Sequence, residues 1–360
     1  MGPKTVKLNG RGRQEDGNRS AILMLSADGA LMEVALPPPP AAARHPTWTF
    51  RLNAQHKAFQ KLFARNRRLP PLPMAVVHPC DTESLRGALD AARHRLIKPI
   101  LVGPAAKIHR VAKAAGLNIS GYEIVSTEHS HAAAEAAVAL ARAGHVEGLI
   151  KGSLHTDELM SAVVAEATGL RTARRISHVF LLDVPAYPRP LLITDAAINI
   201  YPDLETKRDI VQNAIDLAHA LGIARPRVAI LSALETVTSK IPSTIDAAAL
   251  CKMADRGQIT GALLDGPLAF DNAISDVARR AKHITSQVAG RPDILMVPDL
   301  EAGNMLVKQL QYLAGAKAAG IVLGARVPIA LTSRADSAQA RMASAAIAVL
   351  LRTHVKKVHK

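Results

Sequence analysis

Short apolar runs alternate with helical patterns along most of the chain. Apolar runs at 74–78, 99–103, 123–125 and 147–150 predict buried strands, and apolar residues at helical spacing predict helices at 81–94, 105–115 and 131–143. Strands that alternate with helices in this way favour a largely parallel sheet with right-handed crossovers. The first half of the pattern therefore predicts an α/β fold.

The pattern changes around residues 171–178. Two apolar runs, 179–183 and 191–195, are separated by a short proline-rich link, which predicts an antiparallel pair. Further strands are predicted at 228–231, 262–265, 294–297, 321–323 and 329–331, with helices over 204–221, from near Ser243, Asn272 and Ala302, and from about Ala335. Because so many strands exceed what one sheet comfortably holds, we predict two α/β domains with a cleft between them.

The N-terminal segment, residues 1–57, lacks a sustained period. Four consecutive prolines at 37–40 predict a stiff linker, so this extension is expected to be poorly ordered. The first α/β domain is then predicted to comprise 58–176 together with 323–360, and the second to comprise 177–322.

Composition agrees with this fold class. Hydrophobic residues make up 49% of the chain but aromatic residues only 3%, so the core must consist of Ala, Val, Ile and Leu, as in α/β proteins. No apolar run approaches the roughly 20 residues that span a bilayer. The two cysteines, Cys80 and Cys251, are too few for a ligand cluster and predict a reducing, cytoplasmic location.

The net charge of +15 is concentrated at the ends of the chain. Residues 1–68 hold 12 Lys and Arg against 4 Asp and Glu, and residues 352–360 add 4 basic residues, which leaves 29 basic and 26 acidic groups for 69–351. A basic arm can bind nucleic acid through its phosphates. Since no aromatic platform accompanies these ends, solvated extensions are the preferred interpretation, and nucleic acid is not an expected partner.

The first candidate site follows the apolar run at 329–331. This run ends in Thr332, Ser333 and Arg334, just before a helical pattern. A hydroxyl and a guanidinium at a strand end, beside free N–H groups of a helix, suit phosphate or developing negative charge. The alternative is a capping box formed by Ser333 and Asp336, which needs no ligand.

The second candidate is the segment after the run at 147–150. It contains Lys151, Ser153, His155 and Thr156, again between a strand and a helix. These groups and the nearby N–H groups could bind phosphate or a thioester carbonyl. The alternative is a loop in which Thr156 only caps the helix.

Weaker candidates lie at strand ends in the second half of the chain. Asp265 and Asn272 flank Gly266, which permits close backbone approach, and Asn304 follows the run at 294–297. A turn with a helix cap explains the first pair equally well. The sequence contains no phosphate-binding Gly-x-x-x-x-Gly-Lys loop, no dinucleotide fingerprint, no nucleophile elbow and no zinc motif, so no metal or bound cofactor is predicted.

In combination, these segments resemble the phosphate acetyltransferase/phosphate butyryltransferase family over roughly residues 58–351. The resemblance implies a two-domain α/β fold like that of isopropylmalate and isocitrate dehydrogenases, and a homodimer. It implies reversible transfer of a short acyl group between coenzyme A and phosphate, with acyl-CoA, phosphate and acyl phosphate as substrates. In such enzymes the residue matched by Ser333 faces the CoA sulfur, and the residue matched by Arg334 handles phosphate charge.

Two departures from the acetyl-specific pattern concern proton transfer and charge. The family's proposed basic aspartate corresponds to Ala340, so Asp336 is the first candidate for a base and His155 the second. An arginine expected after the His-Thr segment is also missing, since Leu159, Met160 and Ser161 stand there. The segments 332–337 and 266–269 resemble the butyryl-type branch more closely.

The alternative within the same fold is a metal- and NAD-dependent dehydrogenase. That chemistry requires aspartates clustered around a divalent cation. Asp195, Asp265 and Asp299 are instead scattered singly along the sequence. Acyl transfer needs no metal if both substrates are held in near-attack geometry, and we therefore prefer the transferase hypothesis.

Overall fold

The computed structural model describes residues 21–25, 31–35, 57–333 and 336–358. The chain divides into two compact units, residues 1–51 and 52–360. In the first unit, β1 (Ala21–Leu25) and β2 (Leu31–Ala35) pair antiparallel, with Met24 opposite Met32. The sequence pattern did not lead us to expect this hairpin within the N-terminal extension. Its signal is Asp28-Gly29 between two short apolar runs.

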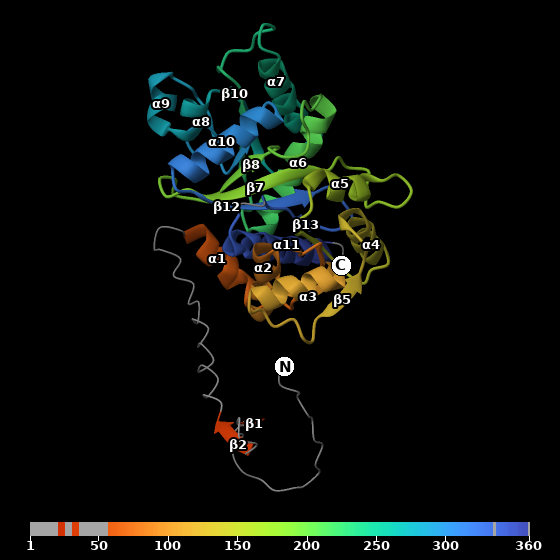
Figure 1. The fold of residues 1–360 in the computed structure, drawn as a ribbon. Helices are drawn as coiled ribbons and strands as arrows, with labels where there is room; N and C mark the ends of the chain where they lie inside the picture. Colours follow the sequence, from red (N-terminus) through yellow and green to blue (C-terminus); the bar gives the residue numbers. More distant parts are fainter. Residues whose placement is uncertain (1–20, 26–30, 36–56, 334–335, 359–360) are drawn as a thin grey trace. The chain divides into compact units, whose positions relative to one another are not determined.

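In residues 57–333 and 336–358 of the second unit, eleven strands form one sheet (Figure 1). Their order is β10-β9-β11-β8-β7-β12-β13-β6-β3-β4-β5. The strands are β3 (Leu72–Val77), β4 (Ile97–Gly103), β5 (Glu123–Ser126), β6 (Leu149–Lys151), β7 (Ser177–Asp183), β8 (Leu191–Thr194), β9 (Arg227–Leu231), β10 (Leu263–Leu268), β11 (Ile294–Met296), β12 (Lys317–Leu323) and β13 (Ile329–Ala330). Each strand predicted from an apolar run is present, and the fold is α/β.

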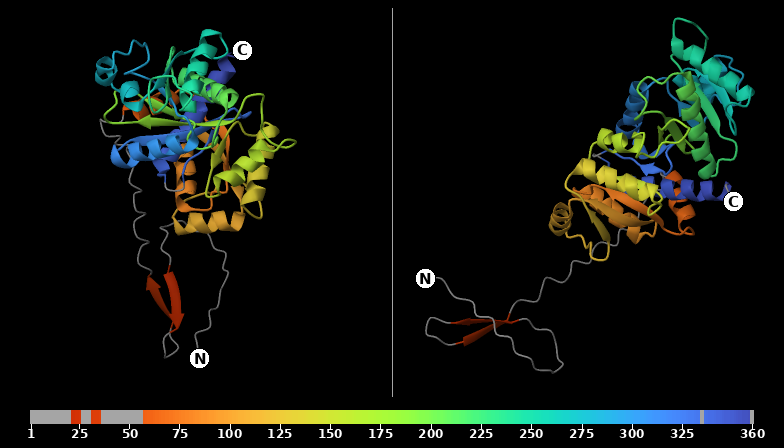
Figure 2. Two further views of the ribbon diagram at one scale, coloured as in Figure 1. Left: turned by 90° about the horizontal axis from the view of Figure 1, so that it is seen from above. Right: turned by 90° about the vertical axis from the view of Figure 1, so that its right-hand side faces the viewer.

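The expectation that these strands are too many for one sheet was wrong. Two sets of parallel strands, β8 to β11 and β3 to β6 with β13, are joined through β7 and β12 by antiparallel pairing. Open sheets of this size occur in large α/β proteins. Because three successive antiparallel pairings, β8 with β7, β7 with β12 and β12 with β13, lie between the two sets, the sets run in opposite directions. Figure 2 shows them at opposite ends of the unit. The predicted domain limits stay a prediction.

Helices cover both faces of the sheet. They are α1 (Lys57–Asn66), α2 (Thr82–Arg93), α3 (Ala105–Ala114), α4 (Ser130–Arg142), α5 (Thr156–Val164), α6 (Leu204–Ala220), α7 (Pro242–Asp255), α8 (Phe270–Ile274), α9 (Asp276–Ala281), α10 (Leu300–Leu313) and α11 (Ala338–Val358). Carboxylates begin several of them: Asp81, Asp203 and Asp299 each accept a backbone N–H bond at 2.7–2.8 Å. None of the helices in the described ranges is long and apolar enough to cross a membrane.

The apolar core differs between the two faces. On one face a continuous cluster joins both strand sets to α1, α2, α6, α7 and α11. On the other face there are two clusters, one under α4 and α5 and one under α8 and α10. Since side chains alternate along a strand, residues of the central strands that point to this second face lie between these two clusters.

Candidate active site

The segment after β6 is fixed to the end of β3. Gly152 N donates to the Val77 carbonyl at 2.8 Å and Ser153 N donates to the His78 carbonyl at 2.9 Å. The Ser153 hydroxyl also donates to the His78 carbonyl at 2.9 Å, and it lies 3.0 Å from His78 Nδ1. The hydroxyl therefore joins the carboxyl ends of the neighbouring strands β6 and β3. The role of Ser153 as a substrate ligand stays a prediction.

Lys151 and the start of α5 complete this segment. Lys151 is 3% exposed and lies on the same strand face as Leu149, which belongs to the cluster under α4 and α5. His155 is the N-cap residue of α5 and is exposed, and its side chain forms no capping hydrogen bond with the helix. Thr156 is the first helical residue. The alternative in which Thr156 caps this helix is therefore wrong.

Two hydrogen bonds join Ser333 to Asp336 in the segment after β13. Asp336 Oδ2 accepts the backbone N–H of Ser333 at 2.7 Å, and Asp336 N donates to the Ser333 carbonyl at 3.1 Å. The helix begins later than predicted, at Ala338, where the Ser337 hydroxyl accepts the N–H of Ala340 at 3.3 Å. Half of the expected Ser333–Asp336 capping arrangement is thus formed, but before the first residue of the helix. Arg334 lies outside the described residues.

Arg341 connects the two segments, and the sequence motifs did not single it out. Its guanidinium donates to the Ser333 carbonyl and to the Thr332 hydroxyl, both at 3.1 Å, and reaches the Lys151 carbonyl at 3.5 Å. The side chain is 2% exposed, and this burial lowers the pKa of Arg341, against the opposing effect of Asp81, Asp336 and Glu83. In the sequence, Arg341 is recognisable only as a single arginine among the small residues of a predicted helix.

His178 lies beside the same site, and the sequence pattern gave no reason to select it. It is fully buried. The next residue of β7, Val179, belongs to the continuous cluster on the first face of the sheet, so the His178 side chain points to the second face. Its Nε2 lies 3.5 Å from the Leu331 carbonyl, just before Thr332. A Cβ added to Gly320 would come within 2.6 Å of this nitrogen, so glycine there makes room for the ring.

The structure brings together the candidates from the first half of the chain and from its end. Lys151, Ser153, His155 and Thr156 follow β6, and Ser333 and Asp336 follow β13, the strand that pairs parallel with β6. Carboxyl ends of parallel strands meet at one edge of a sheet, and there a ligand usually binds. This arrangement presents hydroxyls, backbone N–H groups and a carboxylate at that edge.

The remaining candidates belong to the other strand set. Asp265 in β10 accepts the Gly266 N–H at 2.9 Å, and Asn304 in α10 donates to the Ala196 carbonyl at 3.2 Å. Asn272 is fully buried and donates to Glu235 at 3.1 Å, while its Oδ1 has no partner in the described part of the chain. Their strands run opposite to β6, so their ends face the other sheet edge. Their substrate contacts stay a prediction.

The described ranges contain no group of three or more His, Cys, Asp or Glu side chains placed to hold a metal ion. The expectation that the reaction needs no metal or bound cofactor stays a prediction.

Comparison with known proteins gives a consistent set of relatives. Residues 129–349 match the family described as "Phosphate acetyl/butaryl transferase". A phosphate acetyltransferase of Rhizobium meliloti is 64% identical over 300 residues, which cover 83% of this chain and 95% of that protein. A phosphate butyryltransferase of Clostridium beijerinckii is 40% identical over 295 residues, covering 82% and 98%. A branched-chain phosphotransacylase from Enterococcus faecalis V583 superposes with a TM-score of 0.69 at 29% identity, covering 78% of this chain and 99% of that one.

Proposed function

Because the chain belongs to the phosphate acetyltransferase/phosphate butyryltransferase family, we propose that it transfers a short acyl group reversibly between coenzyme A and inorganic phosphate. The observation that supports this most is the pair of segments after β6 and β13, which Arg341 connects. They lie at the strand edge where α/β proteins bind ligands. The family resemblance inferred from the motifs is confirmed.

The residues support a direct transfer between the two substrates. An oxygen of hydrogen phosphate attacks the thioester carbon, the C–S bond breaks, and the proton that hydrogen phosphate loses passes, through the base, to the CoA thiolate. Arg334 and the N–H groups that begin α5 would neutralise phosphate and the tetrahedral oxyanion. Ser333 would donate a hydrogen bond to the sulfur. Holding both substrates in near-attack geometry can lower the barrier by about 7–11 kcal/mol.

The base in this proposal is Asp336, with His155 as the second candidate. Asp336 already accepts the Ser333 N–H, so it is linked to the candidate site. A carboxylate has further lone pairs with which it could also accept a proton. Ala340 stands where the acetyl-specific pattern has an aspartate.

The substitution Arg334→Ala tests this function. We expect kcat/KM for phosphate-dependent release of CoA thiol to fall by on the order of 10²-fold, as for a lost charge-stabilising donor. Asp336→Asn is the companion variant. A fall of about 10²–10⁴-fold with unchanged melting temperature would identify a base, whereas preserved kcat with lower stability would identify a structural role. An unmutated protein that releases no CoA from any short acyl-CoA would refute the transferase proposal.

We propose acetyl-CoA as the first acyl donor to test, with butyryl-CoA second. The butyryl-type motifs at 332–337 and 266–269 favour the longer chain. Overall identity favours the shorter one, because the relative at 64% is named an acetyltransferase and the butyryltransferase is 40% identical. The ratio of kcat/KM for the two donors decides between them.

The two-domain arrangement with a cleft is also a proposal. The second face of the sheet carries two separate apolar clusters, one for each strand set. The boundary between the sets falls at β12 and β13, close to the predicted limits at 176 and 322. A cleft between the clusters would place Lys151 and His178 at its floor. Small-angle scattering with and without CoA would detect closure of such a cleft.

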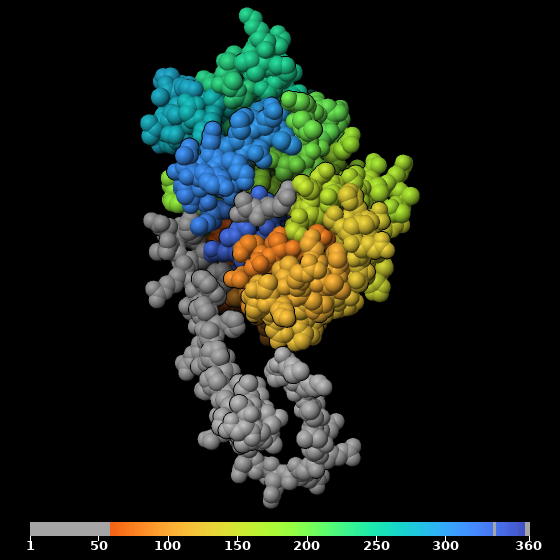
Figure 3. All heavy atoms as spheres, in the orientation of Figure 1, coloured from red at the N-terminus to blue at the C-terminus, as the bar shows by residue number. Residues whose placement is uncertain are grey.

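We propose a homodimer that forms through α10. This helix lies on the surface of the unit (Figure 3), and Met305, Tyr312 and Leu313 are 58%, 74% and 85% exposed. Apolar side chains grouped on one helix face are typical of interaction surfaces. Tyr312→Glu should convert the protein to a monomer in light scattering after size exclusion, whereas Tyr201→Glu, an exposed tyrosine outside α10, should not.

A cytoplasmic location remains a proposal that rests on the cysteines. Cys80 and Cys251 are both free thiols, and burial raises the pKa of Cys251 to about 12 and that of Cys80 to about 11. Free thiols that stay protonated suit a reducing compartment.

A further inference from the structure

Ser153 of the candidate active site shares its hydroxyl with His78, a residue after β3 that the sequence motifs did not single out. The Ser153 Oγ atom lies 2.9 Å from the His78 carbonyl and 3.0 Å from His78 Nδ1, and it accepts the Cys80 N–H at 3.3 Å. A hydroxyl has one proton to donate and two lone pairs that accept. The atom that takes this single proton therefore decides what Ser153 can still offer to a substrate.

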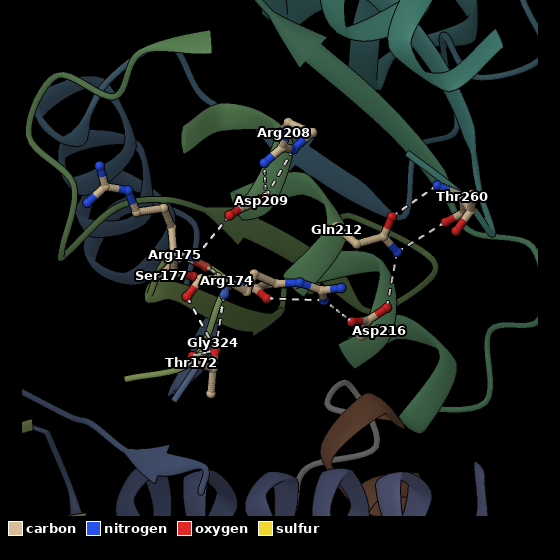
Figure 4. Close-up of polar contacts among 11 residues, drawn as sticks. Thr172, Arg174, Arg175, Ser177, Arg208, Asp209, Gln212, Asp216, Thr260 and Gly324 are labelled. Carbon is tan, nitrogen blue, oxygen red and sulfur yellow. Dashed lines mark hydrogen bonds and ion pairs between the residues drawn. The ribbon is translucent and has the colours of Figure 1, made fainter. Parts of the chain in front are cut away.

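The His78 carbonyl is already occupied by backbone donors. It accepts the N–H of Cys80 at 2.8 Å and that of Ser153 at 2.9 Å, and a carbonyl oxygen has two lone pairs. Thr172 provides a comparison, because its hydroxyl donates to the Gly324 carbonyl at the shorter distance of 2.6 Å (Figure 4). At Ser153 the hydroxyl competes with two N–H groups for one carbonyl, so the imidazole nitrogen is the better acceptor of its proton.

The imidazole of His78 can accept this proton because the ring is neutral at neutral pH. His78 is 8% exposed, and burial lowers its pKa. Lys107 of α3 acts in the same direction, against the opposing effect of Glu158 and Asp81. A neutral imidazole has one nitrogen that accepts a hydrogen bond. With the ring proton on Nε2, Nδ1 is that nitrogen and accepts the Ser153 hydroxyl.

One lone pair of Ser153 Oγ then remains available. The proton is directed to His78 and one lone pair accepts the Cys80 N–H, and the structure gives Oγ no further partner in the described part of the chain. Ser153 is only partly buried, and it lies at the sheet edge of the candidate active site. It therefore faces a substrate as a hydrogen-bond acceptor and not as a donor.

We propose that His78 and Ser153 make the site selective for hydrogen phosphate over tetrahedral anions that carry no proton. The inference rests on the proposed function, because it specifies the form in which the phosphate substrate binds. Hydrogen phosphate has an O–H group that can donate to Ser153 Oγ. Sulfate presents only lone pairs, which an acceptor repels, and a site built to bond a substrate hydroxyl rejects analogues that lack it. His78 is a positioning residue, since it acts through Ser153.

Neighbouring charges do not produce this selectivity. Asp157 and Glu158 lie in the first turn of α5 and oppose the attraction of that helix N-terminus for an anion. At mildly alkaline pH, hydrogen phosphate and sulfate are both tetrahedral dianions. The carboxylates of α5 therefore act on the two anions to the same extent, as do Lys107 and Asp81. The acceptor on Ser153 responds to the one difference between the anions, which is the proton.

Isothermal titration calorimetry of the full-length protein with inorganic phosphate and with sulfate, at mildly alkaline pH, tests the proposal. We expect the Kd for sulfate to exceed that for phosphate by about tenfold or more. Ser153→Ala and His78→Gly should each remove most of this preference. His78→Asn should retain part of it, because an amide oxygen can accept the Ser153 proton. Glycine and asparagine both tolerate the left-handed backbone at His78, where φ is 53°.

His283→Gly is the matched control, because His283 is exposed and has the same φ of 53°. It should keep the preference for phosphate. An unmutated protein that binds sulfate as tightly as phosphate overturns the inference. An unchanged preference in the His78 and Ser153 variants also overturns it, as does equal weakening of both anions, since His78 would then only support the segment. If His78→Gly fails to fold, Ser153→Ala and His78→Asn decide in the same way.

Steady-state kinetics separates this inference from the proposed function. In the active protein, Ser153→Ala and His78→Gly should raise KM for phosphate about tenfold, make sulfate a relatively stronger competitor, and leave KM for acetyl-CoA unchanged. A protein that prefers phosphate to sulfate but releases no CoA from any short acyl-CoA would refute the proposed function and keep the anion selectivity. A protein that transfers acyl groups without distinguishing the two anions would refute the inference alone.

Discussion

A buried guanidinium with several acceptors is difficult to replace, and Arg341 has acceptors in both segments of the candidate site. Arg341→Met leaves the Ser333 carbonyl and Thr332 hydroxyl without their donor, and we expect a loss of about 2–3 kcal/mol in the free energy of unfolding. Arg341→Lys keeps the charge but loses the planar fork, so kcat should fall while stability changes less. Urea unfolding and steady-state kinetics measure the two effects.

Arg225→Lys serves as a control for the loss of an exposed arginine. Normal kcat in both Arg341 variants would show that the connection between the two segments is not needed for turnover.

His178 should make stability depend on pH. Burial lowers the pKa of His178, although Asp195, the Leu331 carbonyl and Asp336 act in the opposite direction. The folded protein therefore keeps the imidazole neutral under conditions in which the unfolded chain, with an ordinary pKa of about 6.5, binds a proton. Because the unfolded state then binds more protons, the free energy of unfolding should fall as the pH decreases below about 6.5.

The variant His178→Phe isolates this contribution. Denaturant unfolding between pH 5 and pH 8 should show a smaller loss of stability on acidification than in the unmutated protein. His145→Phe, at an exposed position, should retain the original pH dependence. Equal slopes for all three proteins would contradict a buried neutral histidine.

Sequence patterns could not identify Arg341 and His178, and the reason is physical. Neither belongs to a motif with local chemistry, and the importance of each comes from carbonyls of segments distant along the chain. Ser153 and Ser333 were found because each follows an apolar run, and strand ends are visible in a sequence. The partner that joins them depends on tertiary packing.

At the scale of single elements, the close approach of the backbone after β6 to the end of β3 requires a glycine at position 152. A Cβ there would lie 2.4 Å from the Val77 carbonyl oxygen and 2.5 Å from that of His78, closer than any real contact. Gly152→Ala should destabilise the protein by about 1–3 kcal/mol, as overpacking does, and should reduce kcat by displacing Ser153. Thermal unfolding and kinetics together measure these losses.

Gly103→Ala is the matched comparison, at the end of β4, which is separated from β6 by β3. Its nearest contact would be 3.3 Å, a separation that a small shift can accommodate. A milder effect at Gly152 than at Gly103 would contradict the steric argument.

The sequence predicted well which strands and helices exist. It predicted their first and last residues, and which strands pair, less well. The apolar runs located the strands because buried parallel strands are continuously apolar. The pattern placed β12 too late, since Ala318, Ala319 and Gly320 are weak apolar signals. It placed α11 too early, because the sequence Ser333-x-x-Asp336 resembles a helix start. The single sheet was missed because strand count alone does not reveal that β7 and β12 continue the hydrogen bonding.

At the scale of the whole molecule, the extension should be dispensable for folding. The unit of residues 52–360 is compact by itself, and Asp183 accepts the N–H groups of Ala58 and Phe59 that begin α1. Deletion of residues 1–51 should therefore leave the melting temperature and kcat/KM within about twofold of the full-length values.

Deletion of residues 1–68 provides the contrast. It removes α1 with Phe59 and Leu62, which are 2% and 3% exposed, and should expose core and cause aggregation. If the shorter deletion also aggregates, the extension stabilises the enzyme and the unit boundary is misplaced.

The position of β13 has a consequence for synthesis on the ribosome. This strand pairs with β6 on one side and β12 on the other, yet among the strands that the structure describes it is the last to be translated. At about 5–20 residues per second, the chain between β6 and β13 takes on the order of ten seconds to emerge. During that interval β6 is an open edge able to pair with another nascent chain. The protein should therefore depend on chaperones while it is made, even though its finished sheet keeps β6 covered.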